Sequence, residues 1–91
     1  MTIYTVFTQV EGLRGFNFAT TDREKAQAKF DYLVDYYTKG FKRYGEVEQR
    51  DWKYDGYIPC IDCQIISADN GQKGRLHEYH QVIIYFDKFD E

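Results

Sequence analysis

The sequence predicts an α+β fold in which one helix packs across a single antiparallel sheet, in the order strand-strand-helix-strand-strand-strand. Three observations lead to this prediction. Residues 2–10 are rich in β-branched and aromatic side chains, residues 22–39 carry apolar side chains at helical spacing, and residues 69–74 have the Asp, Asn and Gly content of a hairpin loop. With 91 residues, of which 43% are hydrophobic, the chain has room for one core, and we expect residues 1–91 to form a single domain.

The chain is expected to open with a hairpin. Residues 2–10 contain no Gly or Pro and form the first strand. Residues 11–15, with two glycines, form the turn, and residues 16–19 alternate apolar and polar side chains as a returning strand does.

The helix is predicted for residues 22–39. Thr21 can cap its free N–H groups, and Glu24 stands three residues later, as a capping box requires. Gly40 offers a left-handed stop, and Phe41 can fold back on the last turn. The apolar stripe of this helix consists of Ala26, Phe30, Leu33, Val34 and Tyr37.

The second half of the chain is expected to complete the sheet. Residues 42–56 fit a helix or a strand, and the alternation of Trp52-Lys53-Tyr54 favours an edge strand followed by a turn at Asp55-Gly56. The remaining elements are a strand over residues 57–67, a hairpin loop over 69–74, a last strand over 77–86 and a polar tail over 87–91.

Charge and hydropathy exclude several classes of function. A net charge of −3 argues against a protein that binds nucleic acid through its phosphates. The longest apolar run, residues 82–86, is far too short to cross a bilayer, and no apolar stretch follows Met1. Two cysteines are too few to staple a secreted mini-protein and fit a reducing compartment. We therefore expect a soluble, cytoplasmic protein without a membrane partner.

The aromatic content points to an interface. The chain has nine Tyr, seven Phe and one Trp. Each buried Tyr hydroxyl needs a hydrogen-bond partner, so nine Tyr side chains cannot all enter one small core at low cost. Exposed Tyr among mixed charges is typical of protein interfaces. The alternative interpretation is that the Tyr residues only line the strands, where their propensity is high.

Two segments are candidates for partner binding. On the helix, a second stripe flanks the apolar one and consists of Lys25, Lys29, Tyr32, Tyr36 and Lys39. Lys29, Tyr32 and Tyr36 can clasp an acidic peptide or a small nucleotide, although the lysine stems can also simply cover the edge of the core. The other candidate is the aromatic segment formed by Trp52, Lys53, Tyr54 and Tyr57.

Cysteine and histidine spacing suggests a zinc site, and strand geometry argues against it. Cys60 and Cys63 are followed by His77 and His80, which is close to the ligand spacing that zinc prefers. In a regular hairpin Cys63 would lie opposite His80. Cys60 and His77 would then point to the other face, because each lies an odd number of residues from its pair. We therefore expect structural thiols, no cofactor and no metal, with zinc as the minor alternative.

No catalytic residues are predicted. Asp62 lies between the two thiols and disfavours the thiolate that redox chemistry needs. A histidine beside Glu78 or Asp62 could act as a base, but the sequence offers no convincing nucleophile or oxyanion site around it. Gly71 and Gly74 follow no strand-to-helix junction, so the sequence predicts no phosphate loop either.

The first 40 residues resemble small bacteriophage accessory proteins. The likeness rests on residues 3–7 (IYTVF) and on the cap and helix start in residues 18–26 (FATTDREKA). This resemblance implies a host-takeover or anti-defence setting and carries no catalytic residues with it. The sequence thus predicts a small non-enzymatic binding protein that occludes or inhibits a bacterial protein partner. A sponge for a small nucleotide signal and a zinc-stabilised interaction module are the alternatives, and open sheet edges also allow a homo-oligomer.

Overall fold

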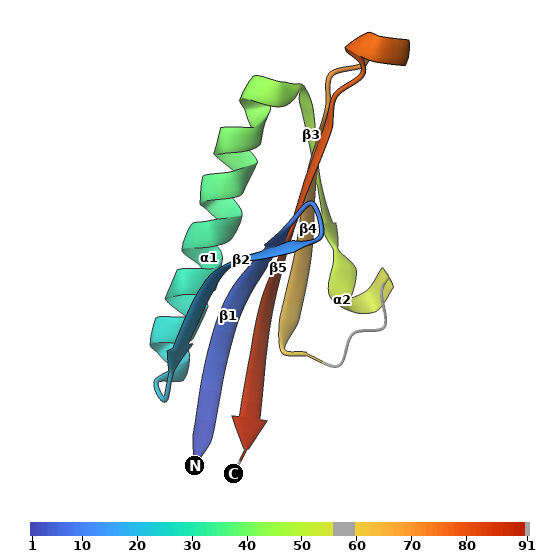
Figure 1. Ribbon diagram of the computed structural model, residues 1–91. Helices are drawn as coiled ribbons and strands as arrows, with labels where there is room; N and C mark the ends of the chain where they lie inside the picture. Colours follow the sequence, from blue (N-terminus) through green and yellow to red (C-terminus); the bar gives the residue numbers. More distant parts are fainter. Residues whose placement is uncertain (56–59, 91) are drawn as a thin grey trace.

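The computed structural model describes residues 1–55 and 60–90 and confirms the predicted fold class and element order. One long helix lies against one face of a five-stranded antiparallel sheet (Figure 1). The strands follow the order β2-β1-β5-β4-β3, which makes β2 and β3 the two edges. The elements are β1 (Thr2–Val10), β2 (Leu13–Thr20), α1 (Arg23–Gly40), the 3-10 helix η1 (Phe41–Tyr44), β3 (Glu46–Asp51), α2 (Trp52–Asp55), β4 (Asp62–Asp69), the 3-10 helix η2 (Gly74–Leu76) and β5 (Tyr79–Asp90).

The core lies between α1 and the sheet, where the predicted helix stripe meets the even-numbered residues of the central strands. Ala26, Phe30 and Leu33 are buried, and Val34 and Tyr37 pack against them as predicted. The strands contribute Val6, Ile66, Ala68, Val82, Ile84 and Phe86. Burial of such side chains stabilises the fold by about 1.5–3 kcal/mol each, so this layer holds α1 in place.

The first hairpin has a tighter turn than predicted. Glu11 and Gly12 both have positive φ, 52° and 85°, which suits a two-residue hairpin turn, and β2 therefore begins at Leu13 instead of residue 16. The register between β1 and β2 then shifts between Phe7 and Gln9, which leaves Thr8 opposite Gly15 and Phe16. A Cβ on Gly15 would lie 2.8 Å from the Thr8 hydroxyl, so glycine allows this β-bulge.

Asp22, and not Thr21, caps the start of α1. The backbone of Asp22 is extended, and its carboxylate accepts hydrogen bonds from the backbone N–H groups of Glu24 (3.0 Å) and Lys25 (3.3 Å). Thr20 Oγ1 in turn accepts a hydrogen bond from the Asp22 N–H at 3.1 Å. The predicted cap at Thr21 was wrong because the residue after it takes the extended conformation that a cap needs.

α1 ends at Gly40, but Gly40 is not the predicted left-handed stop. Its φ of −65° and ψ of −34° are right-handed, and the chain continues into η1. The glycine with positive φ is Gly45, which ends η1 with a φ of 149° and where a Cβ would lie 2.1 Å from the backbone oxygen of Asp69. Phe41 is buried and its ring meets that of Tyr37 edge-on at 5.8 Å, so it packs on the last helical turn as predicted.

Residues 46–55 differ from the prediction. The strand of this region is β3, whereas Trp52-Lys53-Tyr54 belongs to the helical turn α2 and not to an edge strand. Asp51 explains the change, because its carboxylate accepts a hydrogen bond from the Lys53 N–H at 3.2 Å and so opens a helical turn.

In the last hairpin both strands end later in the sequence than predicted, and the loop between them is longer. β4 covers Asp62–Asp69, and residues 57–59 of the predicted strand lie outside the described residues. The loop extends to Glu78 because the Asn70 side chain forms hydrogen bonds across it. The Asn70 side chain accepts from the Glu78 N–H at 3.0 Å and donates to the Leu76 carbonyl at 2.6 Å. β5 continues through the predicted polar tail, where it pairs with β1 as far as Asp90.

The face of the sheet away from α1 is covered only in part. Figure 1 shows α2 on this side, over the half of the sheet that holds β4. Cys63 and Ile65 are buried on this face, with exposures of 0% and 4%. On the other half, Phe7 and Tyr85 stack at 4.6 Å. Within the described ranges, no helix combines the length and apolar character needed to span a membrane.

Candidate partner-binding surface

Helix α1 and strand β2 together present an aromatic and basic surface, which we call the α1–β2 surface and define by Phe18, Lys25, Lys29, Tyr32 and Tyr36. The two Tyr residues are 60% and 57% exposed, and their rings stack with centroids 6.1 Å apart. Lys29 Nζ lies 5.5 Å from the ring centroid of Phe18 and 5.7 Å from that of Tyr32. This lysine therefore joins the helix to the edge strand through two cation–π contacts.

The structure brings together three of the six predicted partner-binding residues, Lys29, Tyr32 and Tyr36. Exposed large rings, held rigidly by stacking, provide contact area at low entropic cost. Lys39, the last residue of the predicted stripe, forms an ion pair with Asp35, with its Nζ 3.0 Å from the carboxylate.

The second predicted segment lies on α2, and its described contacts run to neighbouring parts of the chain. Trp52 and Lys53 are half-buried, and Lys53 Nζ donates a hydrogen bond to the Ile61 carbonyl at 3.1 Å. The Arg50 guanidinium sits 5.3 Å from the centroid of the Trp52 ring. Tyr57 and the side chain of Tyr54 lie outside the described residues. These contacts tie α2 to the sheet, which favours the α1–β2 surface as the binding candidate.

A chain of rings extends the α1–β2 surface around the end of the helix. Tyr36 meets Tyr37 edge-on at 5.3 Å, Tyr37 meets Phe41, Phe41 meets Tyr44 at 5.7 Å, and Tyr44 stacks on His80 at 4.0 Å. A pocket of about 390 Å³ lies away from these rings, on the acidic side of the helix, and another of about 320 Å³ lies among them at its C-terminal end. The latter is lined by Val10, Tyr36, Tyr37, Gly40, Phe41, Arg43 and Tyr44.

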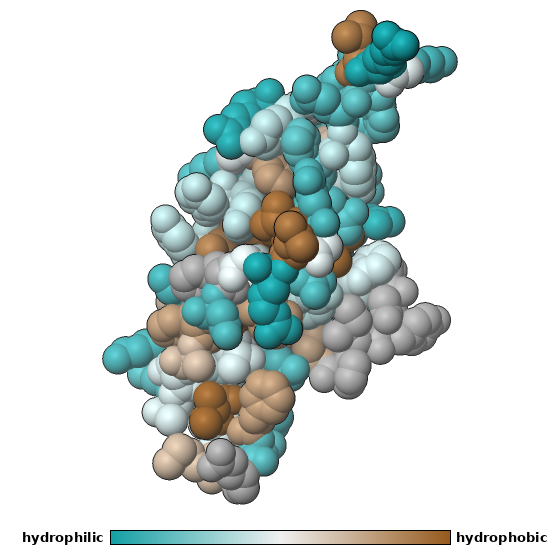
Figure 2. All heavy atoms as spheres, viewed as in Figure 1, coloured by the Kyte–Doolittle hydropathy of each residue, from teal (hydrophilic) through white to brown (hydrophobic). Residues whose placement is uncertain are grey.

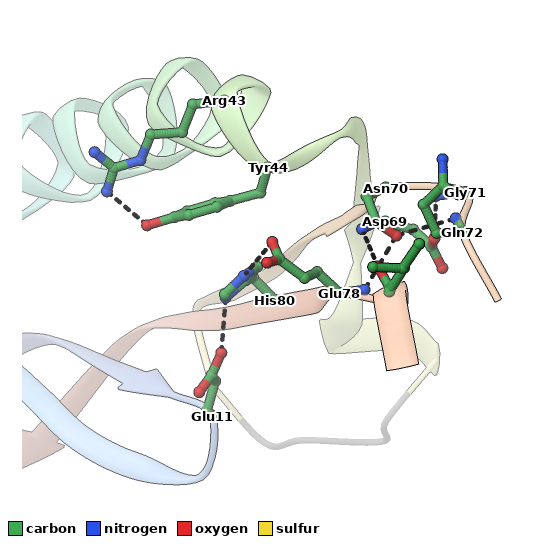
Figure 3. Close-up of polar contacts among 10 residues, drawn as sticks. Glu11, Arg43, Tyr44, Asp69, Asn70, Gly71, Gln72, Glu78 and His80 are labelled. Atoms are coloured by element: carbon green, nitrogen blue, oxygen red, sulfur yellow. Dashed lines mark hydrogen bonds and ion pairs between the residues drawn. The ribbon is translucent and has the colours of Figure 1, made fainter. Parts of the chain in front are cut away.

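Arg43 lines the smaller pocket, and Figure 3 shows it together with Tyr44, His80 and Glu11. Arg43 Nη2 donates to the Tyr44 hydroxyl at 2.6 Å, and its guanidinium lies 4.7 Å from that ring centroid. Below Tyr44, His80 Nδ1 lies 2.9 Å from the Glu11 carboxylate. Sequence reasoning missed this cluster because its members come from a turn, a 3-10 helix and a distant strand. Glu11 and His80 are 69 residues apart in the sequence, so no local sequence signal predicts their contact.

The opposite side of α1 is acidic. The larger pocket lies between the helix and strands β3 and β4 and is lined by Asp31, Asp35 and Asp62, among others. Gln64 connects the strands by donating to Asp62 at 3.0 Å and accepting from Gln49 at 3.1 Å. The two sides of the helix thus carry opposite charge, with lysines toward β2 and carboxylates toward β3.

The cysteines lie together, and their pKa values are raised. Cys63 pairs with Tyr85 and His80 pairs with Ala68, so the predicted Cys63–His80 register was wrong, because the loop is longer than a tight hairpin. Cys60 precedes β4 in a bend and lies beside the Cys63 thiol instead of on the other face, and Cys60 Sγ donates to the Asp62 carbonyl at 3.2 Å. Burial raises the pKa of Cys63 to about 12 and also raises that of Cys60, so both stay protonated.

The histidines are held apart from the thiols and from each other. His77 Nε2 lies 3.1 Å from Asp69 in the loop, whereas His80 lies on the α1 side of β5. The Gly71 N–H and His77 hold the pKa of Asp69 below its usual value. Among the residues that the structure describes, no three His, Cys, Asp or Glu side chains are arranged to hold a metal ion.

Comparison with protein-family models, curated proteins and solved structures finds no match to this chain. Stacked phenol rings and lysine amines bind by contact area, cation–π attraction and charge. The α1–β2 surface is thus suited to recognition.

Proposed function

We propose that this protein is a non-enzymatic binding protein that occludes a protein partner through the α1–β2 surface. The observation that carries the proposal is the exposure of two stacked Tyr rings beside Lys29, at 60% and 57% of their surface. Tyr is among the residues that contribute most to binding energy in protein interfaces. Covering this solvent-exposed pair of rings by a partner removes apolar surface from water, which favours binding.

The setting we propose for this activity is the bacterial host of a phage. The resemblance of the first 40 residues to bacteriophage accessory proteins supports this setting. It suggests a bacterial protein as the partner and inhibition as the effect.

Affinity capture from bacterial lysate, followed by mass spectrometry, tests the proposal. Three baits are compared: wild type, the double variant Tyr32→Ala/Tyr36→Ala, and Tyr79→Ala. Tyr79 is 48% exposed at the start of β5, away from the α1–β2 surface, and serves as the matched control. We expect proteins that wild type and Tyr79→Ala retain and that the double variant loses. Equal capture by all three folded baits, or capture of nothing above background, would contradict the proposal.

A small nucleotide is the second candidate ligand, and the pocket of about 320 Å³ favours it. Tyr36, Tyr37 and Tyr44 supply stacking surfaces there, and Arg43 supplies a cation. A ligand that binds only the folded state raises the melting temperature by mass action. A nucleotide panel in a thermal-shift assay therefore separates the two candidates, because a protein-binding surface alone gives no shift.

A further inference from the structure

Strand β2 is an edge strand beside the α1–β2 surface, and its backbone offers a second kind of recognition. A sheet edge presents N–H and C=O groups that can pair with an added strand. We propose that β2 accepts an extended acidic segment of the partner as a sixth strand of the sheet. This proposal rests on the proposed function and specifies the chemistry of the partner.

The sequence of β2 leaves its edge unprotected. Only Arg14 among its eight residues is charged, whereas four of the six residues of β3 are charged: Glu46, Glu48, Arg50 and Asp51. Charged side chains along an edge are a common means of preventing strand addition. β3 has that protection, and β2 does not.

The β-bulge sets the length of the available template. Thr8 faces both Gly15 and Phe16, which interrupts regular pairing in the first half of β2. Beyond the bulge, Asn17–Thr20 pairs with β1 without interruption, from Asn17 opposite Phe7 to Thr20 opposite Tyr4. The added strand therefore pairs along these four residues.

The charge along β2 selects an acidic segment and disfavours a second copy. Lys29 Nζ lies 5.5 Å from the Phe18 ring centroid, and Lys25 is exposed one turn before Lys29. A second copy paired at β2 would bring the same cations against these, and like charges close together are unfavourable. A carboxylate-bearing strand meets them with opposite charge.

The helix contributes to recognition of the added strand. Alternate side chains of a strand point to the same face, so every second residue of the added segment points toward α1. There the segment meets Lys29 and the rings of Tyr32 and Tyr36. Acidic residues at alternate positions are therefore expected in the bound segment.

Three labelled peptides test strand addition by fluorescence anisotropy: alternating Glu and Val, alternating Lys and Val, and the Glu–Val peptide N-methylated at alternate residues. N-methylation keeps the charge and blocks the backbone hydrogen bonds on one edge. We expect the first peptide to bind and the other two to bind weaker by about tenfold or more. Equal binding of the methylated and unmethylated Glu–Val peptides would overturn the proposal.

The site is checked with the double variant Lys25→Glu/Lys29→Glu and with Lys73→Glu, an exposed residue of the loop after β4, as the control. The double variant should weaken binding of the Glu–Val peptide by about tenfold or more, and the control should change it little. Amide exchange should slow at those residues of 17–20 whose N–H groups point away from β1, and not in β3. Protection of β2 that rises with protein concentration in the absence of peptide would identify a second copy as the occupant and would also overturn the proposal.

The two proposals fail in different ways. If capture depends on Tyr32 and Tyr36 but the Glu–Val peptide does not protect β2, the partner binds the rings without adding a strand. If the peptide protects β2 but no captured protein depends on the rings, the edge chemistry holds and the proposed function fails.

Discussion

β2 and β3 are the two edge strands of one sheet. The half of the molecule around β2 and the half around β3 differ in charge, in how much of the sheet is covered and in how tightly the backbone is packed. β3 is a charged strand, it faces the carboxylates of Asp31, Asp35 and Asp62 across a pocket, and α2 covers the sheet beside it. β2 is nearly uncharged and lies beside lysines and exposed rings.

Exposed apolar residues do not separate the β2 half from the β3 half as clearly as charge does. Figure 2 shows apolar side chains in separate groups, one near the β1–β2 hairpin and one near the chain ends, with hydrophilic side chains between them. Leu13, at 76% exposed, and Phe89, at 58%, are among the exposed apolar residues. Such scattered residues are normal on a protein surface. The difference between the two halves therefore rests on charge and stacked rings more than on a large apolar patch.

The largest expected effect is on the β3 half, through Gly45→Ala. A Cβ at this position would lie 2.1 Å from the Asp69 oxygen, at a φ of 149° that side chains rarely adopt. Neither backbone can move without breaking the entry to β3. We expect a loss of about 3 kcal/mol or more in unfolding free energy, measured by urea denaturation.

Gly40→Ala is the matched control for Gly45→Ala. Gly40 is right-handed in α1, and a Cβ there would have no heavy atom within 4 Å. We expect it to stabilise the protein by about 0.5–1 kcal/mol, because Ala is a better helix former than Gly. A destabilised Gly40→Ala or an unchanged Gly45→Ala would mean that Gly40, and not Gly45, is the glycine that needs a positive φ.

The next largest effect is a loss of stability at high pH, which depends on how well the β3 half of the sheet shields Cys63 from solvent. Cys63 is fully buried, and burial raises its pKa from 9.0 to about 12. The unfolded thiol ionises near pH 9 and the folded thiol does not, so stability is complete below pH 9 and falls as pH rises toward 12. We expect a loss of about 1.4 kcal/mol per pH unit in this window from this thiol.

Comparison with Cys63→Ala isolates that loss, because other groups also titrate above pH 9. The difference in unfolding free energy between wild type and Cys63→Ala should fall as pH rises, while Cys60→Ala should give a smaller change. A pH-independent difference would mean that solvent reaches Cys63.

Most of the fold could be predicted because its signals are local and repeat many times. The helix stripe recurs over about three turns, and one wrong terminal residue, such as Thr21 for Asp22, leaves the packing unchanged. The predictions are wrong where a single hydrogen bond determines the local structure. The hydrogen bond from the Lys53 N–H to Asp51 starts a helical turn at Trp52, where a strand was predicted. The hydrogen bond from the Glu78 N–H to Asn70 lengthens the loop, and the pairing of β4 with β5 therefore differs from the predicted pairing of Cys63 with His80.

The candidate site could be predicted only in the part that belongs to a single helix. Lys29, Tyr32 and Tyr36 share one side of α1, so their spacing alone places them together. Their neighbours could not be found in this way. Phe18 and His80 reach the site through β-sheet pairing, which a single sequence does not encode locally.

An effect of about 1 kcal/mol is expected at the junction of β2 and α1. Asp22→Ala removes a cap that accepts two backbone N–H groups, whereas Thr21→Ala removes no cap. Thermal and urea unfolding should show the loss for the first variant and a change within about 0.5 kcal/mol for the second. A larger loss of stability for Thr21→Ala than for Asp22→Ala would mean that Thr21 caps the helix as the sequence predicted.

The smallest effect on stability is expected at the β3 edge, where the consequence is association. Glu48 is exposed on β3, and its contact with Arg50 at 3.8 Å is a surface ion pair of little energetic weight. Glu48→Thr should therefore change the unfolding free energy by less than about 0.5 kcal/mol.

The same substitution removes a charge from the middle of the β3 edge and leaves a strand that another copy can extend. Gel filtration at increasing concentration should show a larger species for Glu48→Thr than for wild type, because the edge has lost part of its charge protection. Glu78→Thr makes the same change in net charge in an exposed loop and should elute like wild type. If Glu48→Thr also elutes like wild type, charge is not what separates β3 from β2, and the selectivity of the β2 edge must come from the rings of α1 alone.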